Sequence, residues 1–223
     1  MAPNLLLLGH RGARRYSPEN TIPSFDLAIK HGAHGFEFDV RCTRDRHTIL
    51  CHDPKLNRLA VRRYTFRQIG ERCTSGEAPP CLEDILERYG KDTFLNIEVK
   101  VRGIEPIIVE LMRKYRPRHY FVSSFRPGVV RRLHQLDPSL VLGTLAQTRW
   151  QLRRWRVLPV SYVVPHYRLL TQRLMDKLHG AGKKVVTWTV NDPRQMRRAA
   201  DLGVDAIISD DTRLLVQTLG NSR

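Results

Sequence analysis

The sequence predicts an α/β fold, a closed (β/α)8 TIM barrel with a short insertion after the second strand. Two observations support this prediction. Short apolar runs alternate with amphipathic stretches along nearly the whole chain, which is typical of parallel strands joined by right-handed helical crossovers. Eight such strand–helix units can be counted in the 223 residues, and eight units favour a closed barrel over an open sheet. We therefore expect a single domain over residues 1–223.

Each expected strand is a short run rich in apolar and β-branched residues, bounded by polar or turn-forming residues. A ninth run follows the second strand so closely that no helix fits between them. We read it as an extra strand outside the eight-unit rhythm. The strands are expected at Leu5–Gly9, Gly35–Val40, Thr48–His52 (the extra one), Phe94–Val99, Tyr120–Phe125, Leu140–Leu145, Tyr162–Pro165, Lys184–Val190 and Ala206–Ser209.

The expected helices show apolar residues at helical spacing and recognisable ends. In the first, Phe25, Ala28 and Ile29 share one face, and Thr21 is a plausible N-cap. Pro106 falls in a first turn, where proline is tolerated, and Gly90 marks a helix end. The helices are expected at Ile22–His31, Leu82–Tyr89, Ile104–Tyr115, Gly128–Leu136, Arg149–Trp155, Thr171–Gly180, Pro193–Leu202 and Thr212–Leu219.

One polar segment, Asn57–Pro80, interrupts the alternation. We predict an inserted loop there, with one helical turn near Phe66–Ile69 and a final stretch, Ser75–Pro80, that reads SGEAPP. No low-complexity tract, repeat or linker divides the chain into further domains.

The composition is strongly basic: 38 lysines and arginines against 22 aspartates and glutamates give a formal net charge of +16. Such a charge attracts phosphates, nucleic acids and anionic membranes, but it says nothing about fold. The arginine pairs are dispersed along the chain, as on solvated helix faces, and no aromatic-interleaved RNA-binding motif is present. We therefore expect no specific nucleic-acid partner.

The cellular location can be predicted from what the chain lacks. The run Leu5–Leu8 is shorter than the apolar region of a signal peptide, about 7–15 residues. No stretch approaches the ~20 apolar residues of a membrane span. The four cysteines form no CxxC pair and have no zinc-finger spacing, so we expect free thiols. These features predict a cytoplasmic protein.

Two carboxylates stand in the middle of an apolar strand, in the segment GFEFDV. Because strand side chains alternate between faces, Glu37 and Asp39 point the same way, into the barrel. Glu98 has a similar place in FLNIEVK, with Lys100 on its face. Like charges in an enclosed site cost several kcal/mol if unpaired. A hard divalent cation, Mg²⁺ or Ca²⁺, would resolve this, and salt bridges to arginines are the alternative.

Two histidines also fall at strand ends, His10 after the first strand and His52 after the extra one. Histidine titrates near neutral pH, so one can accept a proton while the other donates. Arg11 and Lys100 would supply positive charge to an anionic group. Carboxylates for a metal, two histidines and two cations together predict phosphoryl-transfer chemistry at the C-terminal ends of the strands.

These motifs together resemble those of the glycerophosphodiester phosphodiesterase family. The likeness covers nearly the whole chain, and the ordered set is specific although each motif alone is weak. The matching residues are His10–Gly12, Pro18–Thr21, Glu37-x-Asp39-Val40, Thr43-x-Asp45, His52-Asp53, Glu98-x-Lys100, Ser123–Phe125, Trp188–Asn191 and Gly203–Asp210.

The resemblance implies a (β/α)8 barrel that hydrolyses a glycerophosphodiester to an alcohol and sn-glycerol 3-phosphate. It assigns metal binding to Glu37, Asp39 and Glu98, and acid–base catalysis to His10 and His52. Arg11 and Lys100 become phosphate or substrate contacts. Two residues are harder to place: Glu19 and Asn20 either support the site or belong to a loop and helix cap.

Several features stay open at this stage. Phe125 and Trp188 could pack against the glycerol carbons, or simply pack at the barrel mouth. The nucleophile is either water or the substrate's own glycerol hydroxyl, through a cyclic phosphate. The family commonly carries an R-T-T stretch and a longer insertion after the His-Asp motif; here the insertion is short, and Arg58 receives no role. The headgroup preference and the oligomeric state are not determined.

Two other functions compete with this interpretation. A lysophospholipase D or sphingomyelinase D-like enzyme would use a similar barrel and metal, but it would need an apolar groove for acyl chains. A basic protein that binds nucleic acid or a membrane surface through its charge is the more distant alternative.

Overall fold

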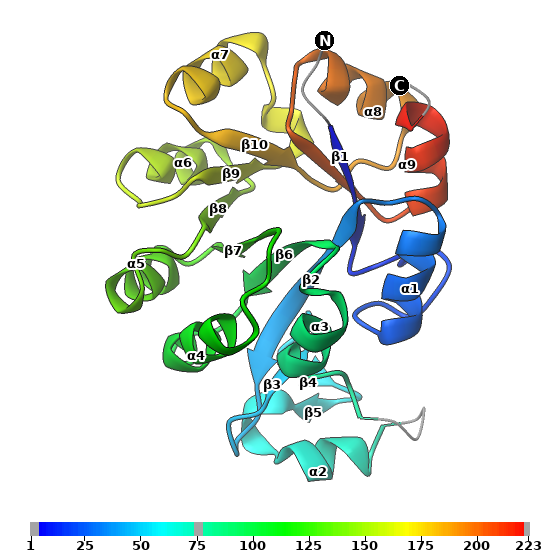
Figure 1. The fold of residues 1–223 in the computed structure, drawn as a ribbon, viewed down its shortest axis with the longest axis vertical. Coiled ribbons are helices and arrows are strands. Elements are labelled where there is room, and N and C mark those ends of the chain that lie inside the picture. Colours follow the sequence, from blue (N-terminus) through cyan, green and yellow to red (C-terminus); the bar gives the residue numbers. More distant parts are fainter. Residues whose placement is uncertain (1–4, 74–77, 221–223) are drawn as a thin grey trace.

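The computed structural model describes residues 5–73 and 78–220. Within them, eight parallel strands close into a barrel, which confirms the predicted (β/α)8 fold (Figure 1). The ring closes where the first strand pairs with both the last and the second. The barrel strands are β1 (Leu6–His10), β2 (Gly35–Cys42), β6 (Phe94–Val99), β7 (Tyr120–Ser124), β8 (Leu142–Ala146), β9 (Tyr162–Pro165), β10 (Lys184–Thr187) and β11 (Ala206–Ser209).

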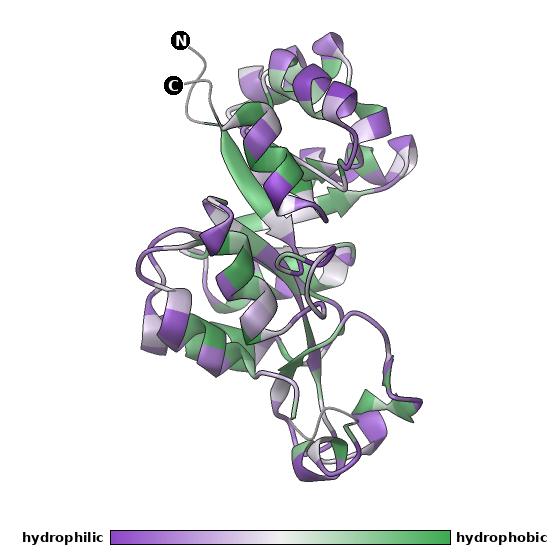
Figure 2. Cartoon of the chain, turned by 90° about the vertical axis from the view of Figure 1, so that its right-hand side faces the viewer, coloured by the Kyte–Doolittle hydropathy of each residue, from purple (hydrophilic) through white to green (hydrophobic). Residues whose placement is uncertain are grey.

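The helices surround this ring, and in Figure 2 they carry both hydrophobic and hydrophilic residues, as expected of elements with one buried face. Thr21 caps the first helix, and its hydroxyl accepts a hydrogen bond from the Ser24 N–H, as predicted. The helices are α1 (Ile22–Lys30), α3 (Leu82–Tyr89), α4 (Glu105–Tyr115), α5 (Pro127–Leu136), α6 (Arg149–Leu152), α7 (Gln172–Gly180), α8 (Pro193–Asp201) and α9 (Thr212–Leu219), with short 3₁₀ turns at Arg153–Arg156 and Tyr167–Leu169.

Some predicted boundaries were wrong. Ile29 was placed on the buried face of α1, but its side chain is 38% exposed because the helix faces the barrel with Ser24, Phe25 and Ala28. The predicted helix Arg149–Trp155 is a single α-helical turn followed by a 3₁₀ turn. The remaining differences are small shifts of strand and helix ends. For example, β8 begins at Leu142 rather than Leu140, β10 stops at Thr187 rather than Val190, and β3 stops at Leu50 rather than His52.

The insertion is more regular than the predicted loop. It follows β3 (Thr48–Leu50), which pairs antiparallel with the end of β2. It contains the hairpin β4 (Lys55–Leu56) and β5 (Leu59–Ala60), a 3₁₀ turn at Val61–Arg63, and the predicted helical turn as α2 (Phe66–Gly70). Figure 1 places it at one end of the long axis, beside α3. Of its predicted final stretch, Ser75–Glu77 lie outside the described residues.

The insertion has a small apolar core of its own. Ile49, Cys51, Val61 and Ile69 are buried together there. A capping box between Thr65 and Gln68 begins α2. This core anchors the hairpin against the end of β2, so the insertion has a defined position beside the barrel.

The alternation along β2 determines which side chains enter the barrel. Phe36, Phe38 and Val40 are fully buried against the helices, and Phe36 stacks on Phe25 at 4.2 Å between ring centroids. Burying each such side chain stabilises the fold by about 1.5–3 kcal/mol. A slip of one residue would turn all three into the barrel and bury the carboxylates under the helices, so the register is strongly specified. Glu37 and Asp39 therefore point into the barrel, as predicted.

Two further predictions concern the chain as a whole. All four cysteines carry free thiols, and burial raises the pKa of the Cys51 thiol to about 11, so it stays protonated at neutral pH. Among the described residues, no helix has the length and apolar character needed to cross a lipid bilayer.

Candidate active site

The predicted site residues line one cavity of about 200 Å³. Many of its lining residues end a barrel strand or follow one, at the end of the barrel where active sites of such barrels lie. Of the nine residues predicted for the site, all but Asp39 line the cavity, and Asp39 contacts two of those that do. The lining residues are His10, Arg11, Glu37, His52, Asn96, Glu98, Lys100, Phe125, Leu145, Gln147, Trp188 and Ile208.

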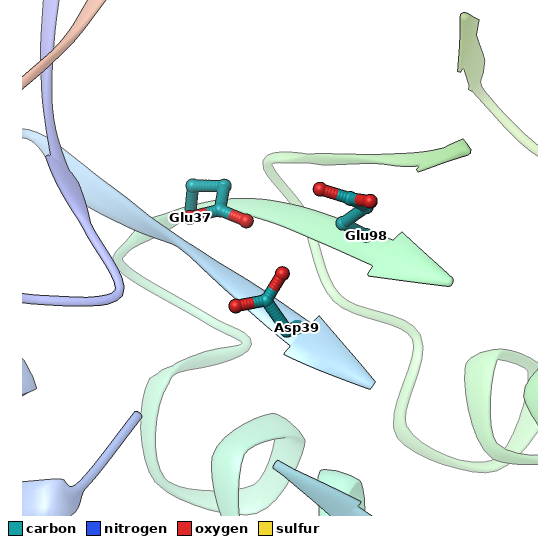
Figure 3. Close-up of side chains that lie close together, drawn as sticks. All are labelled: Glu37, Asp39 and Glu98. Atoms are coloured by element: carbon teal, nitrogen blue, oxygen red, sulfur yellow. The ribbon is translucent and has the colours of Figure 1, made fainter. Parts of the chain in front are cut away.

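The three carboxylates converge, as Figure 3 shows. Glu37 and Asp39 come from β2, and the strand register places Asp39 directly opposite Glu98 on β6. One carboxylate oxygen from each lies within 4.8 Å of the others, and no side chain of the three is more than 8% exposed. Among the described residues, this is the acidic group whose spacing could hold a metal ion.

The strand positions of these residues differ slightly from the prediction. Glu37 is the third residue of β2 rather than a residue at its end, because β2 continues to Cys42 and pairs with β3. The stagger of the barrel still brings Glu37 beside the last residue of β1, His10. The site therefore forms where the short strand β1 ends beside the longer strand β2.

Cationic side chains also contact two of the three carboxylates, Asp39 and Glu98, as in the salt-bridge alternative. Lys100 Nζ lies 2.8 Å from Glu98 and 3.2 Å from Asp39. Arg11 Nε lies 3.0 Å from Asp39 Oδ2 but is not aligned to donate a hydrogen bond. Glu37 has no lysine or arginine within ion-pair distance among the described residues; it accepts a hydrogen bond from the Arg11 backbone N–H at 3.2 Å.

The pKa values separate these carboxylates. Burial, followed by the neighbouring charges of Asp39 and Glu98, raises the pKa of Glu37 well above its usual value. Burial also raises the pKa of Glu98. Burial acts on Asp39 in the same sense, but Lys100, Arg11 and the Asn20 amide together hold the pKa of Asp39 below its usual value. Of the three, Glu37 is therefore the carboxylate without a compensating lysine or arginine among the described residues, whereas Glu98 keeps its contact with Lys100.

The turn after β1 positions Arg11 and Asn20. Both have positive φ, 54° and 58°. Asn20 donates to Asp39 Oδ2 at 3.0 Å and accepts from the Asp39 backbone N–H at 3.2 Å. Arg11 donates to both carboxylate oxygens of Glu19, at 2.8 and 3.0 Å. Glu19 and Asn20 thus contact site residues, and the helix cap is Thr21 instead.

Each histidine has a carboxylate partner. His10 Nδ1 lies 2.6 Å from Asp210 Oδ1, and because a carboxylate only accepts, Nδ1 carries the proton. His10 Nε2 then faces Glu37 at 3.9 Å. His52 Nδ1 lies 2.9 Å from Asp53 Oδ1. His52 is two residues beyond the end of β3, and burial lowers its pKa, so its imidazole is neutral near pH 7.

The two aromatic residues pack against each other at the cavity wall. Phe125 and Trp188 follow β7 and β10 directly, and their rings meet edge to face with centroids 5.5 Å apart. The Trp188 indole N–H donates to the Val164 carbonyl at 3.0 Å, which fixes the ring. Lys100 Nζ lies 6.0 Å from the Phe125 ring. An apolar wall therefore faces the charged one.

The chain matches the model of the glycerophosphoryl diester phosphodiesterase family over residues 10–214. The chain belongs to this family. It is also 31% identical to the glycerophosphodiester phosphodiesterase of Caldanaerobacter subterraneus subsp. tengcongensis, over 95% of this chain and 96% of that protein. The predicted family is confirmed, and so is the prediction that the chain is an enzyme of the phosphodiesterase class.

Solved structures of family members share the fold. The glycerophosphodiester phosphodiesterase of Thermotoga maritima has a TM-score of 0.85 and 24% identity, over 97% of this chain and 99% of that one. A phosphodiesterase of Oleispira antarctica, solved with the product sn-glycerol-3-phosphate, also has a TM-score of 0.85, with 23% identity over 97% of both chains. At identities of 23% and 24%, these structures show that the barrel fold is shared.

Sequence reasoning missed two residues of this family member's site. Asp210 and Asn191 come from the far end of the chain, yet Asn191 donates to Asp210 Oδ2 at 2.6 Å and thereby orients the partner of His10. Both lie in matched motifs, but no local pattern shows that Asp210 contacts a residue 200 positions away, or that Asn191 supports this contact. Asn96, two residues before Glu98 on β6, has a buried amide nitrogen without a partner among the described residues, beside the cavity.

Proposed function

We propose that this chain hydrolyses glycerophosphodiesters to an alcohol and sn-glycerol 3-phosphate with the help of a divalent metal ion. The observation that carries the proposal is the convergence of three buried carboxylates and two histidines on one cavity. Family membership supplies the reaction class. The product found with the Oleispira antarctica relative supports sn-glycerol 3-phosphate as the product here.

The donor set suits a hard cation. Glu37, Asp39 and Glu98 offer three oxygens close enough to share one ion, and two of them bear raised pKa values that nearby positive charge would relieve. Oxygen donors of this kind fit Mg²⁺ or Ca²⁺. When bound, such an ion would polarise the phosphoryl oxygens and offset negative charge as it develops.

The side chains of this chain supply the remaining steps. Arg11 and Lys100 place positive charge at the cavity, where they orient the phosphate and favour its more charged transition state. Asn96 has an amide N–H left to donate to a substrate oxygen. The apolar wall of Phe125 and Trp188 faces the place where the glycerol carbons would lie.

The two histidines divide the proton transfers. We assign the general base to His52, because burial keeps its imidazole neutral near pH 7. It would take the proton of the nucleophile, which is either water or the glycerol hydroxyl. His10 has its Nδ1 proton held by Asp210, and its Nε2 faces the site. It would act as the imidazolium, whose second proton, on Nε2, would pass to the departing alkoxide.

The test begins with metal removal. Protein treated with chelator and then dialysed should hydrolyse glycerophosphocholine and glycerophosphoethanolamine far more slowly than the same protein reloaded with Mg²⁺ or Ca²⁺. Phosphate-specific detection of glycerol 3-phosphate gives the rates. Equal rates with and without metal would remove the carboxylate site from the mechanism.

The lysophospholipase D or sphingomyelinase D-like alternative requires room for an acyl chain. The cavity of about 200 Å³ is smaller than the ~300–1,000 Å³ of typical drug-sized ligand sites, which favours a deacylated substrate. Assaying lysophosphatidylcholine beside glycerophosphocholine separates the two. Faster turnover of the lyso-lipid would replace the proposed substrate class. Binding of nucleic acid or membranes through charge alone would not explain why buried carboxylates and histidines line this cavity.

A further inference from the structure

A second cavity, of about 420 Å³, lies between the barrel and the insertion. One side is formed by Arg41, two residues after Asp39 on β2, and by Val101, which follows Lys100 just after the end of β6. The other side is formed by the hairpin and the 3₁₀ turn of the insertion. Its lining residues are Arg41, Pro54, Lys55, Ala60, Val61, Arg62, Arg63 and Val101.

The cavity has four cations and no acid in its lining. Arg41, Lys55, Arg62 and Arg63 make no ion pair with a carboxylate among the described residues. Arg11 and Lys100 of the neighbouring site, in contrast, are both paired. Pro54, Ala60, Val61 and Val101 supply an apolar surface between the charges. The cavity thus combines excess positive charge with surface suited to a carbon skeleton.

Its position links it to the proposed reaction site. Arg41 lies two residues beyond Asp39 on the same face of β2, roughly 7 Å along the strand. The Arg41 guanidinium donates two hydrogen bonds to the carbonyl oxygen of His52, at 2.9 and 2.6 Å. The same side chain that lines the second cavity therefore holds the segment that carries the proposed base.

We propose that this second cavity binds a phosphate carried by the alcohol portion of the substrate, so that the preferred diesters are those of phosphorylated polyols. This inference rests on the proposed function and specifies its substrate class. Arginine forks match phosphate oxygens bidentately, and charge-assisted hydrogen bonds of this kind are strong. The apolar residues between them would contact the polyol ring carbons.

The test compares two substrates that differ by one phosphate: glycerophosphoinositol and glycerophosphoinositol 4-phosphate. We expect kcat/KM to be higher for the phosphorylated diester by about tenfold or more. In the R62A/R63A variant this ratio should fall toward one. The control, R67A/R72A, removes the same charge from the same insertion, at residues that do not line the cavity, and should keep the ratio. Circular dichroism and thermal melts verify folding, and R62K/R63K should retain part of the preference.

Several outcomes would overturn the inference. One is an equal kcat/KM for both diesters in the wild-type protein. Another is an equal fall of the ratio in R62A/R63A and R67A/R72A, which would show that net charge alone is responsible. A third outcome would show that the phosphate belongs to a lipid headgroup. If R62A/R63A weakens binding to vesicles containing phosphatidylinositol 4-phosphate but leaves the kcat/KM ratio of the two soluble diesters unchanged, the cavity binds a membrane surface instead. Failure to hydrolyse any diester would reject the proposed function itself, a result distinct from loss of preference.

Discussion

At the scale of single residues, the proposed mechanism assigns metal binding and proton transfer to different side chains. Glu37, Asp39 and Glu98 concentrate carboxylates on two adjacent strands, whereas His10 ends β1 and His52 lies in the loop after β3. Each histidine has one ring nitrogen occupied by an aspartate. The free nitrogen of each is thereby set toward the cavity, and this arrangement makes the two residues separately testable.

Replacing either histidine should remove one proton-transfer step. We expect His10→Ala and His52→Ala each to lower kcat by roughly 10²–10⁴, since that is the usual contribution of a general acid or base. Steady-state assays on glycerophosphocholine measure this. His119→Ala, whose side chain is exposed and outside the cavity, is the matched control. Full activity in His10→Ala or His52→Ala would remove that residue from the proposed mechanism.

The pH profile tests the assignment of the base. A base must be unprotonated, and burial lowers the pKa of His52 from its ordinary 6.5. The rate kcat/KM should therefore hold as pH falls to about 6.5 and decline only below it. His52→Ala should lose this acid limb, measured at saturating metal. An acid limb centred above pH 7 would contradict the assignment.

At the scale of elements, the predictable parts are those whose pattern reflects burial. Phe94–Val99 and Leu82–Tyr89 were predicted with the observed bounds, because their apolar spacing decides which face is covered. The hairpin β4–β5 was not predicted. Its turn residues Asn57 and Arg58 both have positive φ, 48° and 67°. Asn-Gly signals such a turn, whereas an arginine in this conformation gives no sequence signal.

The turn after β1 is an element where backbone conformation supports the site. Gly12 has φ +87°, and a Cβ there would lie 2.5 Å from Ser24 Oγ and 2.7 Å from the Ser24 carbonyl carbon. Gly103 has nearly the same φ, +86°, but open space around it. We expect Gly103→Ala to cost about 1–3 kcal/mol from strain alone. Gly12→Ala should cost clearly more and should also lower activity, because the turn presents the Arg11 N–H to Glu37.

Urea denaturation of both glycine variants, with activity assays at matched folded fractions, makes the comparison. Equal losses of unfolding free energy would show that the Ser24 contact relaxes at no cost. An unchanged specific activity in folded Gly12→Ala would show that the site does not depend on this turn.

At the scale of the whole molecule, the barrel brings together residues that no local pattern connects. The carboxylate trio was predictable because two members share a strand and the third recurs in the next barrel strand at the matching position. The contact of His10 with Asp210 was not predictable, because it depends on the closure of the ring between β1 and β11. The three carboxylates proposed as metal ligands belong to neighbouring strands within one continuous sheet.

This architecture predicts that metal binding stabilises the entire fold. An ion that binds only the folded state at 100 times its Kd adds about 2.7 kcal/mol, which in a chain of this size raises Tm by roughly 5–10 °C. Glu37→Gln should raise the Tm of the metal-free protein but weaken the rise in Tm on metal binding. It removes a buried carboxyl group whose pKa is raised by burial and by Asp39 and Glu98, so the chelated variant should melt above the chelated wild type. It also removes a proposed ligand, so added Mg²⁺ or Ca²⁺ should shift its Tm little. Calorimetry of both proteins, with and without metal, measures the four values; an equal metal-induced shift in both would mean that the ion binds elsewhere.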